Sequence, residues 1–294
     1  MGRSRRGYGF VAPAAVLVSC LAIAPLLLLF WLSLRRVMPV FHTDRFGGLA
    51  NFTHLAGDAR FWSSVGTTFY FSVVAVGSEV LLGLGIALLI HRPFRGRALA
   101  RTAVLVPWAL PAVVAARMWE WIYNPEFGVL NYTLERLSLV TSSVSWLGDP
   151  FWAIHAAILA DAWKTTPFAA LILLAGLASI PEDVLRAARV DGAGPWRIFF
   201  EITLPLLRPA LVVTALFRFL DSLRIFDTLY VLTGGGPANT TETLAIYVYK
   251  VLFQTLRFGY GSAIAVAMFL LAAISSLVWL RFAGGGFFGR EEGA

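Results

Sequence analysis

Charged residues occur in pairs inside the most apolar parts of this 294-residue sequence. In three such pairs the opposite charges stand three positions apart: Asp161 with Lys164, Arg218 with Asp221, and Arg224 with Asp227. Residues with this spacing share one face of a helix, so each pair can form an ion pair there. Carboxylate and guanidinium groups also accept and donate hydrogen bonds in a fixed geometry. The pairs therefore offer binding chemistry for a polar ligand.

The composition indicates which elements must carry these pairs. Hydrophobic residues make up 58% of the chain and charged residues only 14%, whereas about a quarter of a soluble domain is charged. We therefore predict a multi-span membrane protein and not an unusually apolar soluble enzyme. Backbone groups in lipid must be paired within each segment, which predicts an all-α integral membrane fold. Six apolar runs approach the ~20 residues that cross a bilayer: 10–34, 61–90, 102–123, 151–177, 209–232 and 261–280.

Basic residues predict the orientation of these helices, because they favour the cytoplasmic side. With both termini in the cytoplasm, the inner segments carry 13 Lys and Arg residues and the outer loops carry 7. The chain then consists of a cytoplasmic tail (1–9), a transmembrane domain (10–282) and a second cytoplasmic tail (283–294). Since topology explains the basic residues, we predict contact with membrane lipid and no nucleic-acid partner.

The first apolar run contains "LVSC" at Leu17–Cys20, which is similar to a lipoprotein cleavage box. The chain stays apolar beyond Cys20, so we expect an uncleaved spanning helix. Cys20 is the only cysteine and the four His residues are scattered. We therefore predict no metal site and no disulfide.

The first two charged pairs lie deep in their predicted helices. A rise of about 1.5 Å per residue places both pairs near the middle of a core about 30 Å thick. An ionisable residue at that depth costs ~3 kcal/mol. Two explanations stay open: a salt-bridge set that locks the fourth and fifth helices together, or the polar wall of a translocation cavity.

Under the second explanation, two helical stripes bind the substrate. Their members are Asp161, Lys164, Thr165 and Phe168 in the fourth helix, and Arg218, Asp221 and Ser222 in the fifth. Charged and hydroxyl groups match the donors and acceptors of a polar ligand, and an aromatic ring covers an apolar face of it.

Other polar and aromatic residues of the spans receive a different interpretation. Glu79, and the pair formed by Arg117 and Glu120, are interpreted as structural ion pairs or as residues of an outer gate. Trp108 is interpreted as an anchor at the inner end of the third helix, because tryptophan is enriched at membrane interfaces.

The segment from Pro181 to Pro209 interrupts the apolar pattern between the fourth and fifth helices. Pro181 and the acidic residues after it suit the start of a helix. Gly192 suits the end of that helix and Pro195 the start of the next. We predict a helix–turn–helix at the inner membrane surface, which serves either as a connector resting on lipid or as a docking element for a cytoplasmic partner.

The sequence "RAARVDGA" (Arg186–Ala193), followed by "FFEITLPLLRP", resembles the EAA loop of permease subunits in binding-protein-dependent ABC importers. In that family the loop docks on the ATPase, which implies a coupling loop at 181–205. Arg186 stands where the family usually has Glu. The resemblance assigns ATPase coupling to the residues Leu185, Arg186, Ala187, Ala188, Asp191, Gly192 and Ala193.

A second segment, "FRFLDSLRIFDTLYVLTGGGPANTTETLAIYVYKVLF" (Phe217–Phe253), resembles maltose- and trehalose-type carbohydrate permeases, as do "NFTHL" and "WLGDP". This resemblance implies the type I importer permease fold in the bacterial cytoplasmic (inner) membrane. It also implies a second permease subunit, two ATPase subunits that hold ATP and Mg²⁺, an extracytoplasmic sugar-binding (lipo)protein and a disaccharide substrate such as trehalose, maltose or another α-glucoside. The chain itself lacks a G-x-x-x-x-G-K-[ST] motif, so we predict no bound cofactor and no enzymatic activity.

Two other functions would also suit a multi-span membrane protein. A proton-driven secondary sugar transporter would use Asp161 or Asp221 as its proton carrier, but the EAA-like loop argues against it. A membrane-embedded enzyme would need a nucleophile with its base, or a metal cluster, and the sequence suggests neither.

Overall fold

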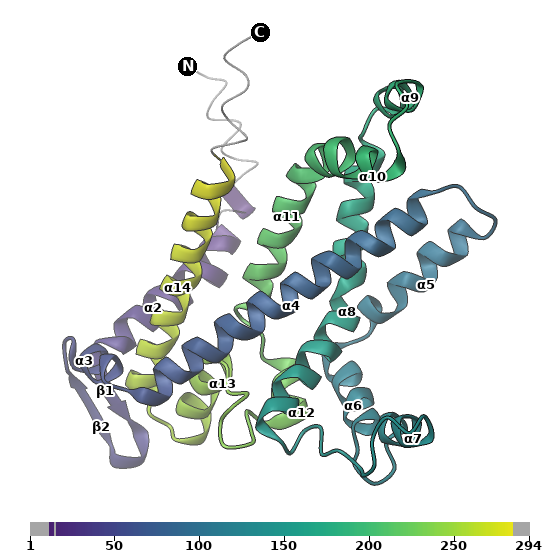
Figure 1. Ribbon diagram of the computed structural model, residues 1–294. Coiled ribbons are helices and arrows are strands. Elements are labelled where there is room, and N and C mark those ends of the chain that lie inside the picture. The colour runs from purple at the N-terminus through teal and green to yellow at the C-terminus, as the bar shows by residue number, and fades with distance from the viewer. Residues whose placement is uncertain (1–11, 15, 285–294) are drawn as a thin grey trace, which may run out of the picture. The chain divides into compact units, whose positions relative to one another are not determined.

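The computed structural model describes residues 12–14 and 16–284 (Figure 1). The predicted tail at 1–9 and most of the one at 283–294 lie outside the described residues. Contacts divide the chain into two compact units. The first comprises the residues up to Ser63 together with Leu244–Leu271, and the second comprises Ser64–Thr243 and the chain from Ala272 onward.

The first unit is built on apolar helices. Its elements are the π-helix η1 (Ser19–Ile23), α2 (Ala24–Ser33), β1 (Arg35–Met38), η2 (Pro39–Phe41), β2 (Thr43–Phe46), α3 (Ala50–Ala56), α13 (Leu244–Tyr249), the π-helix η4 (Lys250–Gln254) and the first part of α14 (Phe258–Gly284). α2 has no polar face because its sequence, APLLLLFWLS, is apolar all round, as in a lipid-embedded helix. The antiparallel pair β1–β2 is the one exception to an all-helical chain among the described residues.

The second unit is all helical in its described part. Its elements are most of α4 (Ala59–His91), α5 (Arg97–Ala109), α6 (Ala112–Ile122), α7 (Val129–Arg136), α8 (Pro150–Ala178), α9 (Glu182–Val190), α10 (Pro195–Arg197), the π-helix η3 (Ile198–Thr203), α11 (Leu204–Ser222), α12 (Asp227–Thr233) and the end of α14. Its core surrounds α8, which is rich in alanine. Small residues let the helices approach closely: a Cβ on Gly176 would lie 2.5 Å from the Cβ of Ala210 on α11.

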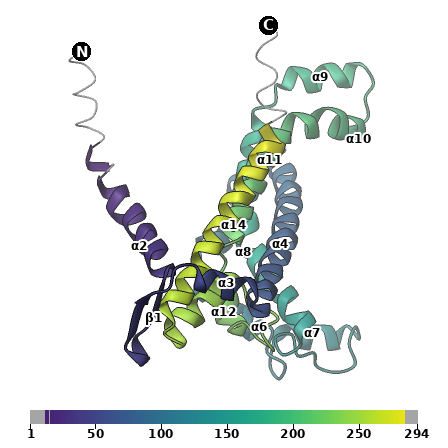
Figure 2. The same cartoon turned by 90° about the vertical axis from the view of Figure 1, so that its left-hand side faces the viewer.

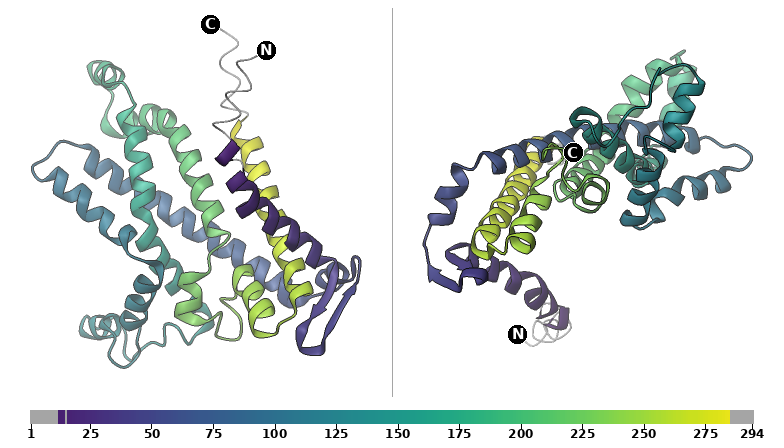
Figure 3. Two further views of the ribbon diagram at one scale, coloured as in Figure 1. Left: turned by 180° about the vertical axis from the view of Figure 1, so that it is seen from behind. Right: turned by 90° about the horizontal axis from the view of Figure 1, so that it is seen from below.

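The apolar helices follow four of the predicted spans closely: the first, second, fourth and sixth end within a few residues of the predicted bounds. The third does not, since α5 and α6 meet at an angle of 92° (Figures 1 and 3). Leu110 is extended because a proline follows it. The prediction of one continuous helix over 102–123 is therefore wrong.

The bounds of the fifth predicted span, 209–232, are also wrong. One helical segment runs from Pro195 to Ser222, and α12 is a separate helix beyond a break at 223–226. Pro209 lies inside α11 and does not start it. The π-helix η3 precedes α11, and such wide turns commonly accommodate bends in a helix.

The predicted helix–turn–helix at Pro181 is present in modified form. α9 ends at Val190, Gly192 adopts a left-handed φ of 78°, and Pro195 opens the next helix. Figure 2 shows α9 beside the α10–η3 segment, joined by this turn. The second helix continues into α11, so the hairpin and the fifth span form one connected element.

Candidate functional site

Three helices of the second unit bring charged side chains together. Arg218 on α11 donates from Nε to Glu79 Oε2 of α4 at 2.5 Å, and from Nη2 to Glu79 Oε1 at 3.1 Å. Arg218 Nη2 also lies 3.7 Å from Asp161 Oδ2 of α8, an ion pair that is too long for a hydrogen bond. The side chain of Glu79 is fully buried and that of Arg218 is 6% exposed.

The ion network continues from this buried core toward the surface of α11. Arg218 Nη1 lies 2.7 Å from Asp221 Oδ2, and Arg224 Nη2 lies 2.8 Å from Asp221 Oδ1. The exposed fraction of the side chains rises to 48% at Asp221 and 73% at Arg224. Charges therefore alternate in sign from Glu79 to Arg224.

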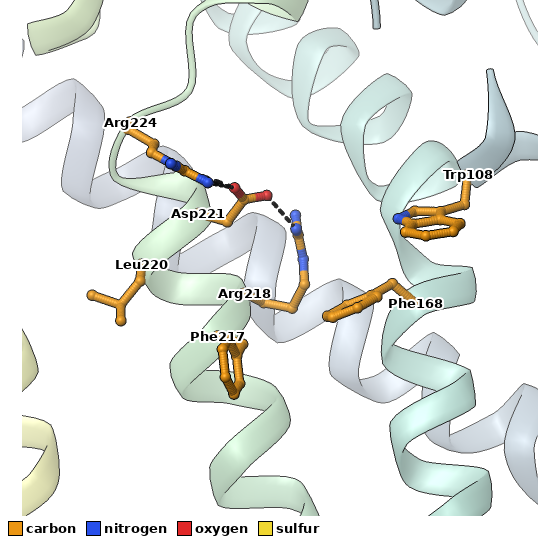
Figure 4. Close-up of a pocket in the computed structure, with 7 residues that line it drawn as sticks. All are labelled: Trp108, Phe168, Phe217, Arg218, Leu220, Asp221 and Arg224. Atoms are coloured by element: carbon orange, nitrogen blue, oxygen red, sulfur yellow. Dashed lines mark hydrogen bonds and ion pairs between the residues drawn. The ribbon is translucent and has the colours of Figure 1, made fainter. Parts of the chain in front are cut away.

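A cavity of about 370 Å³ adjoins the exposed end of this network (Figure 4). The rings of Trp108 and Phe168 stack with their centroids 6.0 Å apart and their planes 21° apart. Figure 4 shows this aromatic pair on one side of the cavity and the charged groups of Arg218, Asp221 and Arg224 on the other. The lining residues are Trp108, Phe168, Phe217, Arg218, Leu220, Asp221 and Arg224.

The structure separates the seven predicted substrate residues into two groups. Phe168, Arg218 and Asp221 line the cavity. The remaining four, which do not line it, are Asp161, Lys164, Thr165 and Ser222. Asp161 is buried in the ion network, while the Thr165 hydroxyl donates to the Asp161 carbonyl oxygen at 2.7 Å within α8.

Two of the predicted ion pairs are not formed. Asp161 faces Arg218 instead of Lys164, and Arg224 pairs with Asp221 instead of Asp227. α11 ends at Ser222, so the chain between Arg224 and Asp227 does not follow the helical spacing on which the second prediction depended. The Arg218–Asp221 pair is confirmed.

Sequence reasoning missed Glu79, Trp108 and Arg224 as parts of this site. Glu79 is a partner of Arg218 and not a separate pair. Trp108 lies three residues before Pro111, where the chain bends between α5 and α6, and its side chain lines the cavity. Pro111 was the residue from which this bend could have been predicted. The pair of Arg117 with Glu120 is confirmed, at 2.5 Å.

The predicted coupling residues lie on α9 and on the turn that follows it. Arg186 Nη2 pairs with Asp183 Oδ1 at 2.6 Å, so its charge is partly satisfied within α9. The hairpin exposes apolar side chains as well, among them Val190 (88%) and Trp196 (74%).

Comparison with known proteins points to one family. The family model described as "Binding-protein-dependent transport system inner membrane component" matches residues 79–283. The trehalose/maltose transport system permease protein MalF of Thermococcus litoralis is 40% identical over 95% of this chain and 93% of its own. The trehalose transport system permease protein SugA of Mycobacterium tuberculosis is 40% identical over 97% of this chain and 90% of its own.

A third relative is similar in sequence, and two solved structures are similar in fold. The sulfoquinovosyl glycerol transport system permease protein SmoG of Agrobacterium fabrum is 41% identical over 92% of this chain and 88% of its own. A bacterial ABC transporter that imports the acidic polysaccharide alginate has a chain of the same fold, with a TM-score of 0.80, 22% identity and 96% of each chain covered. A bacterial alginate transporter in complex with its alginate-bound periplasmic protein gives a TM-score of 0.78, with 23% identity over 96% of this chain and 93% of the other.

Proposed function

Since the chain belongs to the family of binding-protein-dependent transport system inner membrane components, we propose that it is a permease subunit of an ATP-driven importer for an uncharged carbohydrate of about disaccharide size. The relatives named for trehalose and maltose transport support this substrate class. The chain itself supplies no covalent chemistry. It alternates access to the cavity between Trp108 and Arg218.

The observation that carries the proposal is the pairing of an aromatic wall with a charged wall. The stacked Trp108 and Phe168 offer a flat apolar surface, and a sugar ring has one apolar face. Arg218, Asp221 and Arg224 offer donors and acceptors for the hydroxyl groups at its edge. The cavity volume of about 370 Å³ lies at the lower end of the range of ligand pockets, roughly 300–1,000 Å³.

Formal charge favours a neutral sugar over an acidic one. The ion network holds three carboxylates, Glu79, Asp161 and Asp221, against two arginines, Arg218 and Arg224. An acidic sugar would bring a further negative charge to a network that has no cation left to pair with it, which is unfavourable.

Coupling to ATP hydrolysis is assigned to the 181–205 hairpin. Its second helix continues into α11, which carries Arg218 and Asp221 about 35 Å of helix further along. Movement of the hairpin by two docked ATPase subunits, which hold ATP and Mg²⁺, therefore reaches the cavity through continuous backbone. A second permease subunit and an extracytoplasmic sugar-binding (lipo)protein complete the transporter.

Reconstitution tests this function. The chain is purified with its partner permease, ATPase and sugar-binding protein, and placed in proteoliposomes. We expect trehalose or maltose to stimulate ATP hydrolysis and ATP-dependent uptake, and an acidic disaccharide to do neither. Uptake that continues without ATP and stops when a proton gradient is dissipated would instead support the proton-driven alternative.

A further inference from the structure

The β1–β2 hairpin of the first unit is held rigidly at its base. Asn51 Nδ2 donates to the carbonyl oxygens of Ser33 and Arg35, at 2.7 and 2.9 Å. Gly259 of α14 approaches the same strand so closely that a Cβ there would lie 2.0 Å from the Arg35 carbonyl oxygen. An isolated two-stranded hairpin is marginally stable in water, so these contacts fix an element that would not hold its shape alone.

The tip of this hairpin is apolar and exposed. The short turn η2 links the strands, and within it Val40 is 60% exposed and Phe41 75% exposed. Phe46 at the end of β2 is 67% exposed. A rigid element that presents large apolar side chains is characteristic of a contact surface.

Two exposed arginines face each other across the strands. Register places Arg36 directly opposite Arg45, and like charges in this position destabilise a strand pair. Arg35 has Asp44 as its partner at 2.8 Å, but no described carboxylate lies within ion-pair distance of Arg36 or Arg45. The positive-inside rule also disfavours these residues, because we predict the hairpin on the outer side.

In the predicted orientation, the hairpin extends beyond the lipid layer. We place the membrane interface at Trp31 of α2, whose ring centroid lies 5.5 Å from the Arg35 guanidinium, because tryptophan is enriched at such interfaces. Four extended residues from Arg35 to Met38 span about 13 Å, whereas each headgroup layer is roughly 5–8 Å thick. Figures 1 and 2 show the hairpin continuing past the ends of α2 and α14, on the side opposite the start of α2.

We propose that the hairpin formed by β1, η2 and β2 is a docking element for the extracytoplasmic sugar-binding protein, and that it fits an acidic surface with an apolar recess. This inference rests on the proposed function. Carboxylates of the partner neutralise Arg36 and Arg45, which relieves their repulsion. Phe41 fills the recess. Charges at the rim of such an interface chiefly speed encounter, and a buried aromatic side chain slows release.

Charge reversal tests the docking surface. The complex is placed in nanodiscs with the neighbouring-gene binding protein, purified and loaded with trehalose or maltose. The double variant Arg36→Glu/Arg45→Glu should raise the binding-protein concentration for half-maximal stimulation of ATP hydrolysis by about tenfold or more. Hydrolysis without binding protein should stay unchanged, and Arg36→Lys/Arg45→Lys should behave as wild type. Equal half-maximal concentrations for the reversed variant and wild type would overturn the proposal.

A fluorescent label tests binding without relying on ATP hydrolysis. Cys20 is the single cysteine, so the variant Cys20→Ser/Val40→Cys takes one environment-sensitive dye at the hairpin tip. In nanodiscs of phosphatidylglycerol and phosphatidylethanolamine, we expect emission typical of water, shifted to the blue when binding protein is added. The shift should weaken with added salt and disappear with the charge reversal. Emission already blue-shifted without binding protein would show that lipid covers the tip and would overturn the proposal.

The two measurements distinguish failure of docking through the hairpin from failure of the proposed transport cycle. A dye response that depends on Arg36 and Arg45, in a complex whose ATP hydrolysis does not respond to sugar, supports docking and contradicts the proposed transport cycle. Sugar-stimulated hydrolysis with no dye response supports the transporter and overturns docking through this hairpin.

Discussion

Two carboxylates in this protein are stabilised in opposite ways. In the second unit, Glu79 is fully buried against the Arg218 guanidinium, within a network of alternating charges. In the first unit, Asp58 is half-buried and accepts hydrogen bonds from the Tyr247 hydroxyl at 2.5 Å and from the Tyr260 hydroxyl. One carboxylate is neutralised by a cation, and the other keeps its charge among neutral donors.

The two arrangements differ in how many charges depend on one another. The Asp58 cluster ties the start of α4 to α13 and α14, and the Arg257 guanidinium lies 4.9 Å from the centroid of the Tyr260 ring. Each of its hydrogen bonds adds a modest, local stabilisation. In the Glu79 network every charge depends on its neighbours, so a change at one residue alters the balance of the whole site.

The largest effect is expected from removing Glu79. Glu79→Ala leaves Arg218 buried with incomplete compensation, and breaking a buried ion pair typically costs about 3–5 kcal/mol. We expect a loss of this size in the free energy of unfolding, measured in nanodiscs, together with loss of sugar uptake. Glu120→Gln, in the more exposed pair with Arg117, is the control and should change stability by less than about 1 kcal/mol. Similar losses of stability in both variants would mean that the buried Glu79 network contributes no more than an exposed ion pair.

A smaller effect is expected at Asp58. Asp58→Asn replaces a charged acceptor by a neutral one, and hydrogen bonds to charged groups contribute about 1.5–3 kcal/mol. We expect a loss of stability near the lower end of this range, since the amide oxygen still accepts. Tyr247→Phe removes one such hydrogen bond and should also cost about 1.5 kcal/mol. Neither change should alter the sugar concentration for half-maximal uptake, and a large shift there would make this cluster part of the substrate site.

The same cluster predicts how stability depends on pH. Burial raises the pKa of Asp58, but the hydrogen bonds from Tyr247 and Tyr260 outweigh it, so the pKa lies below its usual value. Burial and Asp58 raise the pKa of Tyr247 to about 12. The Asp58 contribution is therefore complete above pH ~4 and lost as pH falls through the lowered pKa. The Tyr247 contribution is complete below pH ~10 and lost as pH rises toward 12. The difference in the free energy of unfolding between wild type and Asp58→Asn should therefore be smallest in acid.

The smallest effect on stability is expected at Arg224, the exposed end of the network. Arg224→Gln should change the free energy of unfolding by less than about 1 kcal/mol, as for other exposed ion pairs. Because Arg224 lines the cavity, we still expect a severalfold rise in the sugar concentration for half-maximal uptake. Unchanged transport would place the sugar away from this end of the cavity.

Local sequence rules predicted local structure well. The α9 hairpin followed from Pro181, Gly192 and Pro195, because helix starts and ends depend on residues close in sequence. The Arg218–Asp221 pair followed from helical spacing for the same reason. Glu79 lies 139 positions from its partner Arg218, and no spacing rule connects them.

The remaining errors came from treating each apolar run as one straight helix. Pro111 breaks the third run and moves Trp108 into the cavity, while Pro209 is tolerated inside α11. Both prolines follow a helix, but α5 ends before Pro111 and α6 begins after it, whereas α11 continues on both sides of Pro209. The β1–β2 hairpin has only four residues in each strand, too few for a clear alternating pattern.

α8 and α11 cross where Gly176 closely approaches Ala210. Phe168 lies eight residues from Gly176, and Arg218 lies eight residues from Ala210, so each helix carries its cavity residue about 12 Å from the crossing. With arms of this length, a rotation of about 10° at the crossing displaces Phe168 and Arg218 by roughly 2 Å each. A small change in the angle between α8 and α11 therefore changes the width of the cavity that both residues line.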